Sequence, residues 1–294
     1  MNKSFKRAQT ILGFLTPEAT HLTNLQRFGS ANDGGYIMLN DVSANDYLIS
    51  MGVGDDINFE KDLCTKILGA DLYDYTVAKL PAIIENSRFF PERIGSLGST
   101  TLMSTVERVP IGAELLLKID IEGSEWDALS IVDHETLNKF RQIVIEFHGL
   151  ENILEDVFYE KALNVLKKLD ETHFVLNVHP NNNSRVIFVE NLLIPEVVEV
   201  SYLRRSSYGV KFTGSNVLAT LNSPCNPSYP EIFLQSIENL DKLDLETFTV
   251  GHFSLKEKAI LTNARDAIVA ERDAIKNSRI WRYSRFYRDF RRVT

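Results

Sequence analysis

The sequence contains little cysteine, and its two cysteines are not arranged for cross-linking. Only Cys64 and Cys225 occur among 294 residues. They lie far apart and belong to no CxxC motif or Cys/His spacing, so the sequence supports neither a disulfide framework nor a zinc site. This pattern favours a reducing compartment.

Long apolar runs are also missing. The N-terminal stretch has only a five-residue apolar run before Thr16 and Pro17, which is too short for the apolar core of a signal peptide. No segment approaches the roughly 18 apolar residues that a membrane-spanning helix needs. We therefore expect a cytoplasmic protein.

Basic residues are outnumbered by acidic ones. The chain has 32 Lys and Arg against 40 Asp and Glu, which gives a net charge of −8. A partner made of nucleic acid would require a basic face, so this balance argues against one.

The C-terminal segment 278–294 departs from this acidic average, with six Arg and one Asp. On a helical wheel Ile280 and all the aromatic residues except Trp281 share one arc, and most of the arginines lie opposite. Such a basic amphipathic helix is typical of binding to an anionic membrane surface, and we expect peripheral association with the inner membrane. Docking onto an acidic protein surface and a disordered tail are the alternatives.

The segment before this tail has weak heptad spacing. Leu261, Ile268 and Ile275 are seven residues apart, and RDAI occurs twice. This spacing is compatible with a coiled coil, and therefore with a homo-oligomer formed through 255–278, or with a solvated helical stalk.

Most of the chain alternates between apolar strand-like runs and helical patterns. Because the strands are apolar on both faces, we predict a doubly wound, Rossmann-like α/β domain with a mostly parallel seven-stranded sheet. This domain should span 1–222, followed by a Pro-containing linker or wrapping segment at 223–254 and a C-terminal helical extension at 255–294. The expected strands are 46–54, 70–77, one within 87–99, 115–123, 141–150 and 172–180, with a late pair at 197–205 and 207–212. Helices are expected at the N-terminus, at 58–69 with Gly69 as its stop, at 101–109, from about 124, and at 153–170.

The turn after the first strand of this pattern indicates a nucleoside-bearing ligand. Gly52 and Gly54 let backbone approach a ligand closely, and Asp74 follows Gly54 by 20 residues, the spacing of an acidic residue that binds a ribose diol. Asp55 and Asp56 would repel a pyrophosphate. The pattern therefore favours a cationic adenosine ligand without phosphates over NAD, and S-adenosylmethionine is such a ligand.

Several stretches together resemble the FkbM-like S-adenosylmethionine-dependent methyltransferases of the class I superfamily. The resemblance covers roughly 28–220, and its most specific piece is the D-x-E-G-x-E segment that begins at Asp120. Its stretches are ANDGGYIML (31–39), ISMGVGDDINFEKDL (49–63), LYDYTV (72–77), LLLKIDIEGSEWDAL (115–129) and IVIEFHGL (143–150). The resemblance implies O-methylation, often of sugar hydroxyls. Many class I enzymes carry an acidic residue just before the first glycine of the turn, whereas this chain has Ser50 and Met51 there. Asp55 could supply part of the ligand contact that the acidic residue makes in those enzymes.

Three carboxylates end the strand at 115–123. Asp120 should face the cleft beside the methyl donor, Glu122 should shape the turn, and Glu125, with Ser124 before it, should support the start of the next helix. The DGGY turn either forms a lip over the cofactor, which Asp33 or Tyr36 contacts, or is a plain turn that Asp33 holds.

The proposed reaction needs a base, and His148 is the first candidate because an imidazole titrates near neutral pH without special tuning. His179, after the next strand, competes for this role. A divalent-cation site is an alternative that we do not favour, since no tight ligand spacing enforces it. Its ligands would be Asp120, Glu122, Glu146 and His148.

We therefore predict an S-adenosylmethionine-dependent O-methyltransferase that methylates a hydroxyl group. The expected acceptor is a sugar or glycan, namely a sugar of a bacterial surface polysaccharide or of its precursor. The alternatives are a Rossmann-fold binding or scaffold protein without catalysis, and a nucleotide-sugar or NAD-linked enzyme.

Overall fold

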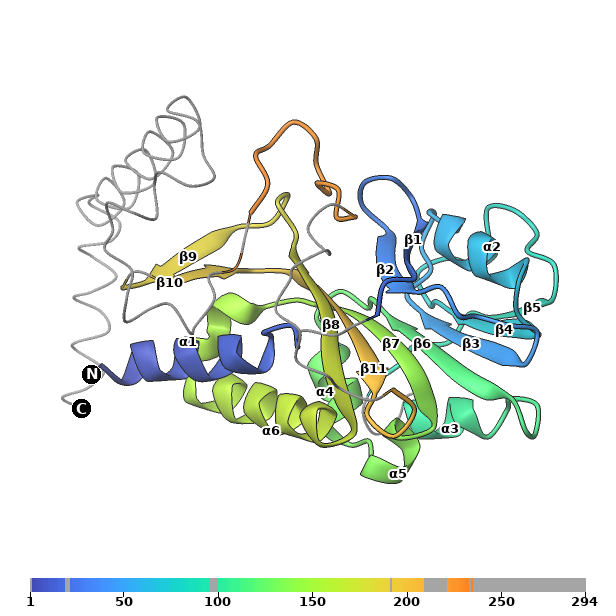
Figure 1. Cartoon of the computed structure of the whole chain (residues 1–294), viewed down its shortest axis with the longest axis horizontal. Helices are drawn as coiled ribbons and strands as arrows, with labels where there is room; N and C mark the ends of the chain where they lie inside the picture. Colours follow the sequence, from blue (N-terminus) through green and yellow to red (C-terminus); the bar gives the residue numbers. More distant parts are fainter. Residues whose placement is uncertain are drawn as a thin grey trace, which may run out of the picture. The chain divides into compact units, whose positions relative to one another are not determined.

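A seven-stranded sheet forms the centre of the protein in this computed structural model, which describes residues 2–18, 22–95, 100–190, 192–208, 221–232 and 234 (Figure 1). The order across the sheet is β5-β4-β3-β6-β7-β11-β8, and β11 runs antiparallel to both of its neighbours while the other pairs that touch are parallel. The strands are β3 (Asp46–Met51), β4 (Gly69–Tyr73), β5 (Ser87–Phe90), β6 (Glu114–Ile119), β7 (Phe140–Phe147), β8 (His173–Pro180) and β11 (Val198–Arg204).

The strand order defines the class of fold. Numbered along the chain, the six strands that share one direction lie in the order 3-2-1-4-5-6 of a Rossmann sheet, with β11 inserted between the last two. The order reverses between β3 and β6, so the carboxyl ends of these two strands flank the expected ligand site. The predicted mostly parallel seven-stranded sheet is confirmed.

Helices and two hairpins cover the sheet. In Figure 1, α1 and α6 run side by side below β8, and hairpin β1–β2 lies beside α2 near the other edge. The chain winds toward β5 in its first half and toward β8 in its second, so right-handed crossovers place the helices of the two halves on opposite faces. The helices are α1 (Lys3–Phe14), α2 (Asn58–Cys64), α3 (Leu102–Val106), α4 (Glu125–Ser130), α5 (His134–Leu137), η1 (Leu150–Leu154) and α6 (Asp156–Thr172). The hairpins are β1 (Leu25–Gly29) with β2 (Gly35–Leu39), and β9 (Val186–Val189) with β10 (Leu192–Pro195).

The central strands form the core because both of their faces are covered. Every residue of β3, β4 and β7 is buried. Trp126 of α4 stacks on Phe147 of β7 with ring centroids 4.3 Å apart, which fixes the helix that follows the D-x-E-G-x-E turn.

The prediction for Gly69 is wrong. The helix ends at Cys64, and Gly69 opens β4 instead, paired with Tyr47. A Cβ atom at this position would lie 2.7 Å from the backbone oxygen of Asn86, so the glycine permits close approach of the chain before β5. The two hairpins were not predicted from the sequence.

Some sequence predictions concern segments outside the described residues. These are most of the late strand at 207–212, the coiled-coil pattern and the basic tail 278–294. The chain divides into two compact units, Met1–Ile237 and Glu238–Thr294. The first unit includes the Pro-containing stretch 221–232, which contacts the sheet domain.

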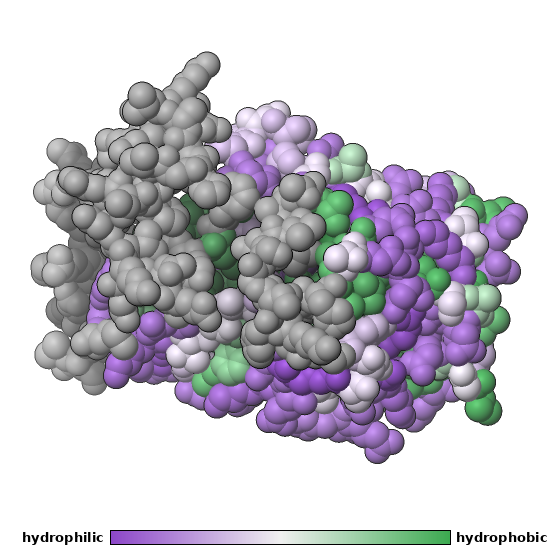
Figure 2. All heavy atoms as spheres, in the orientation of Figure 1, coloured by the Kyte–Doolittle hydropathy of each residue, from purple (hydrophilic) through white to green (hydrophobic). Residues whose placement is uncertain are grey.

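The described surface in Figure 2 is mainly hydrophilic, with hydrophobic residues at several separate places. Among the helices of the described part, none is both long enough and apolar enough to cross a bilayer.

Candidate active site

A cleft of about 630 Å³ lies at the carboxyl ends of the strands, at the point where their order reverses. It is lined by the glycine turn after β3, the end of β4, the D-x-E-G-x-E turn after β6, and the residues that follow β7 and β8. All six predicted cofactor residues line it, together with His148: they are Asp33, Gly52, Gly54, Asp55, Asp74 and Asp120.

The two glycines after β3 serve different purposes. Both have left-handed backbone conformations, with φ of 77° at Gly52 and 58° at Gly54. A Cβ atom on Gly52 would lie only 1.5 Å from the backbone oxygen of Asp120, so this glycine lets the chains after β3 and β6 meet. At Gly54 a Cβ atom would have no neighbour within 4 Å, so this turn exposes open backbone to the cleft.

Asp74 holds the glycine turn and still offers acceptor positions. Its carboxylate accepts hydrogen bonds from the Gly54 amide at 2.8 Å, from the Thr76 amide at 2.7 Å and from the Thr76 hydroxyl at 2.6 Å. Burial raises the pKa of Asp74, but these hydrogen bonds outweigh it and the pKa is lowered. An ionised carboxylate has about four lone-pair sites, so Asp74 can accept a further hydrogen bond from a ligand hydroxyl.

Lys118 lies beneath the glycine turn, a position that the sequence interpretation did not single out. Its ammonium donates to the backbone oxygen of Gly52 at 2.6 Å and lies 3.7 Å from Glu60 and 3.8 Å from Asp120. Ser50, which stands where many class I enzymes carry an acid, donates to Glu60 at 2.6 Å. The signal was a single lysine inside the apolar run LLLKI, because a buried lysine needs carboxylate partners.

Asp120 directly follows β6 and lines the cleft, the position predicted for it. Its carboxylate lies 3.2 Å from the Tyr36 hydroxyl, which is buried beneath the turn that carries Asp33. Tyr36 therefore contacts Asp120 rather than lining the cleft, whereas Asp33 does line it. Burial, with the charge of Asp120 next in importance, raises the pKa of Asp33.

His148 is held by a buried carboxylate. Its Nδ1 lies 3.1 Å from Glu125, and its Nε2 lies 3.4 Å from the exposed Glu122. Glu125 is fully buried and also accepts hydrogen bonds from the backbone amides of Ile121 and Gly123. The prediction that Glu125, with Ser124 before it, only supports the helix start is thus incomplete for Glu125. Ser124 is the N-cap residue, but its side chain makes no cap hydrogen bond.

The expectation that His148 titrates without special tuning is also wrong. Burial lowers its pKa, but the hydrogen bond and charge of Glu125, with the charges of Glu146 and Asp120, outweigh this effect and raise the pKa to about 9. The raised pKa favours the protonated imidazole at neutral pH.

His179, the competing base, lies outside the cleft lining and is 2% exposed. Its Nδ1 is 2.9 Å from Glu199, and its Nε2 is hydrogen-bonded to Glu231. Both ring nitrogens are thus occupied by carboxylates. Burial lowers the pKa of His179, but the two hydrogen bonds outweigh it and raise the pKa to about 9.

The cleft is strongly acidic. Nine carboxyl groups line it, and the basic side chains among its lining residues are Lys118 and His148. Glu146 is buried among them, and burial, reinforced by the charges of Asp120 and Glu199, raises its pKa well above the usual range. Such a cleft attracts a cationic ligand and repels phosphate groups.

The four ligands expected for the alternative divalent-cation site do not all lie together. Donor atoms of Asp120, Glu122 and His148 lie within 4.8 Å of one another, whereas Glu146 groups instead with Asp33 and Glu199. The four residues therefore do not form one ligand set.

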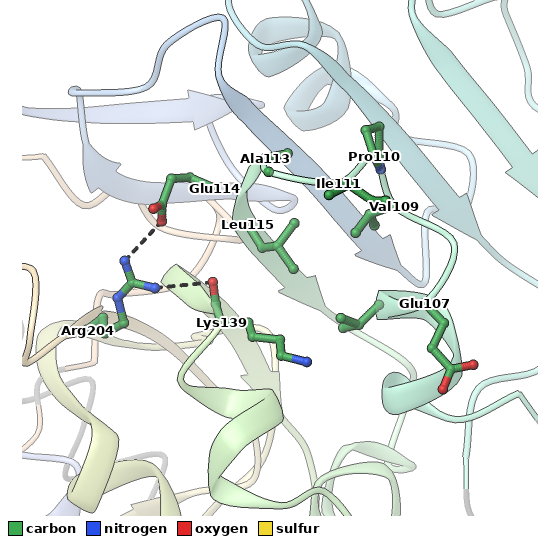
Figure 3. Close-up of a pocket in the computed structure, with 11 residues that line it drawn as sticks. Glu107, Val109, Pro110, Ile111, Ala113, Glu114, Leu115, Lys139 and Arg204 are labelled. Carbon is green, nitrogen blue, oxygen red and sulfur yellow. Dashed lines mark hydrogen bonds and ion pairs between the residues drawn. The ribbon is translucent and has the colours of Figure 1, made fainter.

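A second hollow, of about 320 Å³, lies at the opposite ends of the strands (Figure 3). There Arg204 points to Glu114 at 2.9 Å and to the backbone oxygen of Lys139, so the guanidinium of Arg204 is already paired. This hollow is at the end of a Rossmann sheet that does not carry the ligand site.

Comparison with protein-family models and with curated proteins gives no match. Among solved structures, the chain is similar to a Streptococcus mutans protein in complex with S-adenosylhomocysteine, at 12% identity over 55% of this chain and 88% of the other, with a TM-score of 0.33. It is also similar to an rRNA methylase from Streptococcus thermophilus, at 9% identity over 55% and 89% with a TM-score of 0.34. A dimethyladenosine transferase from Plasmodium falciparum matches at 12% identity over 56% and 58%, with a TM-score of 0.35.

Proposed function

We propose that this chain is an S-adenosylmethionine-dependent methyltransferase, and more specifically an O-methyltransferase that acts on a sugar hydroxyl. The observation that carries the proposal is the acidic cleft at the switch point, with an open glycine turn on one side. S-adenosylmethionine combines an adenosine, a sulfonium cation and an ammonium group with no phosphate. NAD and nucleotide sugars carry phosphates, which the acidic lining of the cleft would repel.

Asp74 and Gly54 would bind the nucleoside part of the donor. Asp74 is ionised, fixed by three hydrogen bonds and located at the end of β4, so it can accept a hydrogen bond from a ribose hydroxyl. Gly54 leaves room for the ligand to reach the backbone. Asp33 and Asp120 would provide negative charge for the cationic part of the donor.

His148 would receive the acceptor proton. In this reaction the hydroxyl oxygen bonds to the methyl carbon, the carbon–sulfur bond breaks, and S-adenosylhomocysteine leaves as a neutral thioether. The hydroxyl proton passes to Nε2, since Nδ1 is fixed by Glu125. The positive charge of the bound donor would lower the pKa of His148 and prepare the imidazole to accept that proton.

The lining residues that follow β8 favour a neutral, hydroxyl-rich acceptor. Asn181, Asn183 and Ser184, which follow β8, line the cleft with amide and hydroxyl groups. Such groups form hydrogen bonds with sugar hydroxyls without adding charge. Attachment of the enzyme to an anionic membrane through 278–294 would place it near precursors of a surface polysaccharide.

The test is calorimetry with S-adenosylmethionine, S-adenosylhomocysteine and NAD, followed by labelled methyl transfer to a glycan panel. We expect both adenosyl ligands to bind and NAD to bind far more weakly. Binding of NAD alone would contradict the proposed donor. Donor binding without methylation of any hydroxyl acceptor would favour a scaffold protein that keeps the fold.

Replacement of each histidine separates the two candidate bases. We expect His148→Ala to keep donor binding and to lose a factor of roughly 10² to 10⁴ in turnover, the range for a missing general base. If His179→Ala shows that loss and His148→Ala does not, the proposed role of His148 is wrong.

A further inference from the structure

A second cluster of ionisable side chains lies behind the cleft, where segment 221–232 meets the sheet. It contains His179 of β8, Glu199 of β11 and Cys225, which are 2%, 4% and 6% exposed. Glu199 is paired with His179 on one side and with Glu146, which lines the cleft, on the other. The cluster therefore adjoins the cleft but is separate from its lining.

We propose that His179, Glu199 and Cys225 bind a transition-metal ion of the zinc class. Imidazole nitrogen, carboxylate oxygen and thiolate sulfur are the three kinds of donor that zinc uses in proteins. Their donor atoms all lie within 4.8 Å of one another, and all three side chains are buried.

The spacing of the donor atoms fits one ion. His179 Nδ1 lies 2.9 Å from one oxygen of Glu199, and Cys225 Sγ lies 3.3 Å from the other. In a tetrahedral zinc site, the usual metal–ligand bond lengths place neighbouring donor atoms about 3.3 to 3.5 Å apart. The Cys225–Glu199 separation matches this range, and the His179–Glu199 separation is about 0.4 Å shorter, so His179 would move outward when the ion enters.

The surroundings of His179 are those of a metal ligand. Its other nitrogen, Nε2, is hydrogen-bonded to Glu231, and a carboxylate in this position commonly orients a histidine that binds metal through its first nitrogen. The second oxygen of Glu231 is buried and has no hydrogen-bond partner among the described residues.

Metal binding would leave the charge of the cluster unchanged. Without metal, both nitrogens of His179 face carboxylates, and the Cys225 thiol donates to Glu199. Binding of a divalent ion releases the proton from Nδ1 and the proton from Sγ. Two protons thus leave while two positive charges enter, so the net charge of these side chains does not change.

The ion would attach segment 221–232 to the sheet. The segment is already bound by Asn182, whose side chain donates to the backbone oxygens of Asn226 and Tyr229 and accepts from the Asn226 amide. Cys225 adjoins this contact and supplies the only proposed ligand outside the sheet. In Figure 1 the segment is the orange loop.

The experiment uses the full chain, reduced and treated with chelator, and adds Co²⁺ and Zn²⁺ alone. Co²⁺ should produce a thiolate-to-cobalt absorption band that Zn²⁺ removes. Cys225→Ser should abolish this band, whereas the matched control Cys64→Ser, which changes the other cysteine, should retain it. Glu231→Gln should weaken Zn²⁺ binding about 10- to 100-fold, the usual effect of losing the carboxylate that orients a ligand.

Proton release provides a second readout. Calorimetry in buffers of different ionisation enthalpy should show about two protons released per Zn²⁺ near neutral pH. If Cys225→Ser does not fold, the Cys64→Ser protein still decides, because Zn²⁺ should protect its single thiol from a thiol reagent. Absence of the cobalt band in the wild type, or a band lost equally in Cys64→Ser, would overturn the proposal, as would Zn²⁺ binding without protection of Cys225.

Discussion

Replacement of Glu125 by Gln should change the titration of His148 more than any other single substitution near the cleft. Glu125 is fully buried, and its carboxylate lies 3.1 Å from Nδ1 of His148. The amide of Gln keeps the size of the side chain and one acceptor oxygen for the amides of Ile121 and Gly123. It removes the negative charge, so the effect on His148 is largely electrostatic.

The magnitude follows from the pKa of His148, which is raised from its usual 6.5 to about 9 although burial acts in the opposite direction. Without Glu125, burial and the weaker charges of Glu146 and Asp120 remain. We expect the pKa of His148 to fall by about 2 units, which corresponds to about 3 kcal/mol of differential interaction.

This shift also affects stability, and the sign is defined. Because the folded pKa of His148 is higher than the unfolded one, its protonation stabilises the fold fully below about pH 6.5, and that contribution disappears as pH rises through about 9. The part of the stability difference between wild type and Glu125→Gln that comes from His148 should therefore be largest at acidic pH and vanish above pH 9.

The assay is NMR titration of the imidazole resonances, with His148→Gln to assign the signal, and it requires no acceptor. Glu122→Gln is the matched control, because Glu122 lies 3.4 Å from Nε2 of the same ring but is 86% exposed, so water screens its charge. We expect the control to shift the pKa by a few tenths of a unit. A His148 pKa that stays near 9 in Glu125→Gln would refute the reasoning.

Three further predictions concern the donor site and the tail. Asp74→Ala should weaken donor binding by about 1.5–3 kcal/mol in calorimetry, the scale of a hydrogen bond to a charged group, and unchanged affinity would remove Asp74 from the site. Gly54→Ala should impair donor binding with a stability loss of about 1 kcal/mol in thermal unfolding, whereas Gly52→Ala should prevent stable folding, because its Cβ would overlap the backbone of Asp120. Deletion of 278–294 should leave turnover on a soluble acceptor intact and abolish binding to anionic liposomes, which in the intact protein should weaken as salt shortens the Debye length from about 10 Å at 0.1 M to about 3 Å at 1 M.

The fold could be predicted from the sequence where the signal is periodic. Alternation of apolar strands and helices predicted the parallel sheet, since strands covered on both faces are mainly apolar, and every residue of β3 and β7 is buried. The hairpins β1–β2 and β9–β10 were missed because their strands have four or five residues and lie outside the alternation. The position of β11 between β7 and β8 follows from pairing between segments distant in sequence, which no local pattern reports.

Some contacts in the cleft could likewise be predicted from the sequence, and others could not. The spacing between Gly54 and Asp74 follows from the topology, because one crossover and one strand separate the ends of β3 and β4. In the structure the Gly54 amide nitrogen lies 2.8 Å from a carboxylate oxygen of Asp74. The contact between Glu125 and His148 depends on the packing of α4 against β7. It joins residues 23 positions apart through geometry that the sequence does not encode as a pattern.

The two histidines show why ionisation alone cannot identify a catalytic base. Each is buried against carboxylates, and each has a pKa raised to about 9. His148 has one nitrogen on buried Glu125 and the other beside exposed Glu122 at the cleft, so a proton from the acceptor can reach it. His179 has both nitrogens on carboxylates outside the cleft lining, so proton exchange with an acceptor would first require these hydrogen bonds to break. Access to the cleft, which is set by strand order, therefore favours His148 over His179 for the proposed proton transfer.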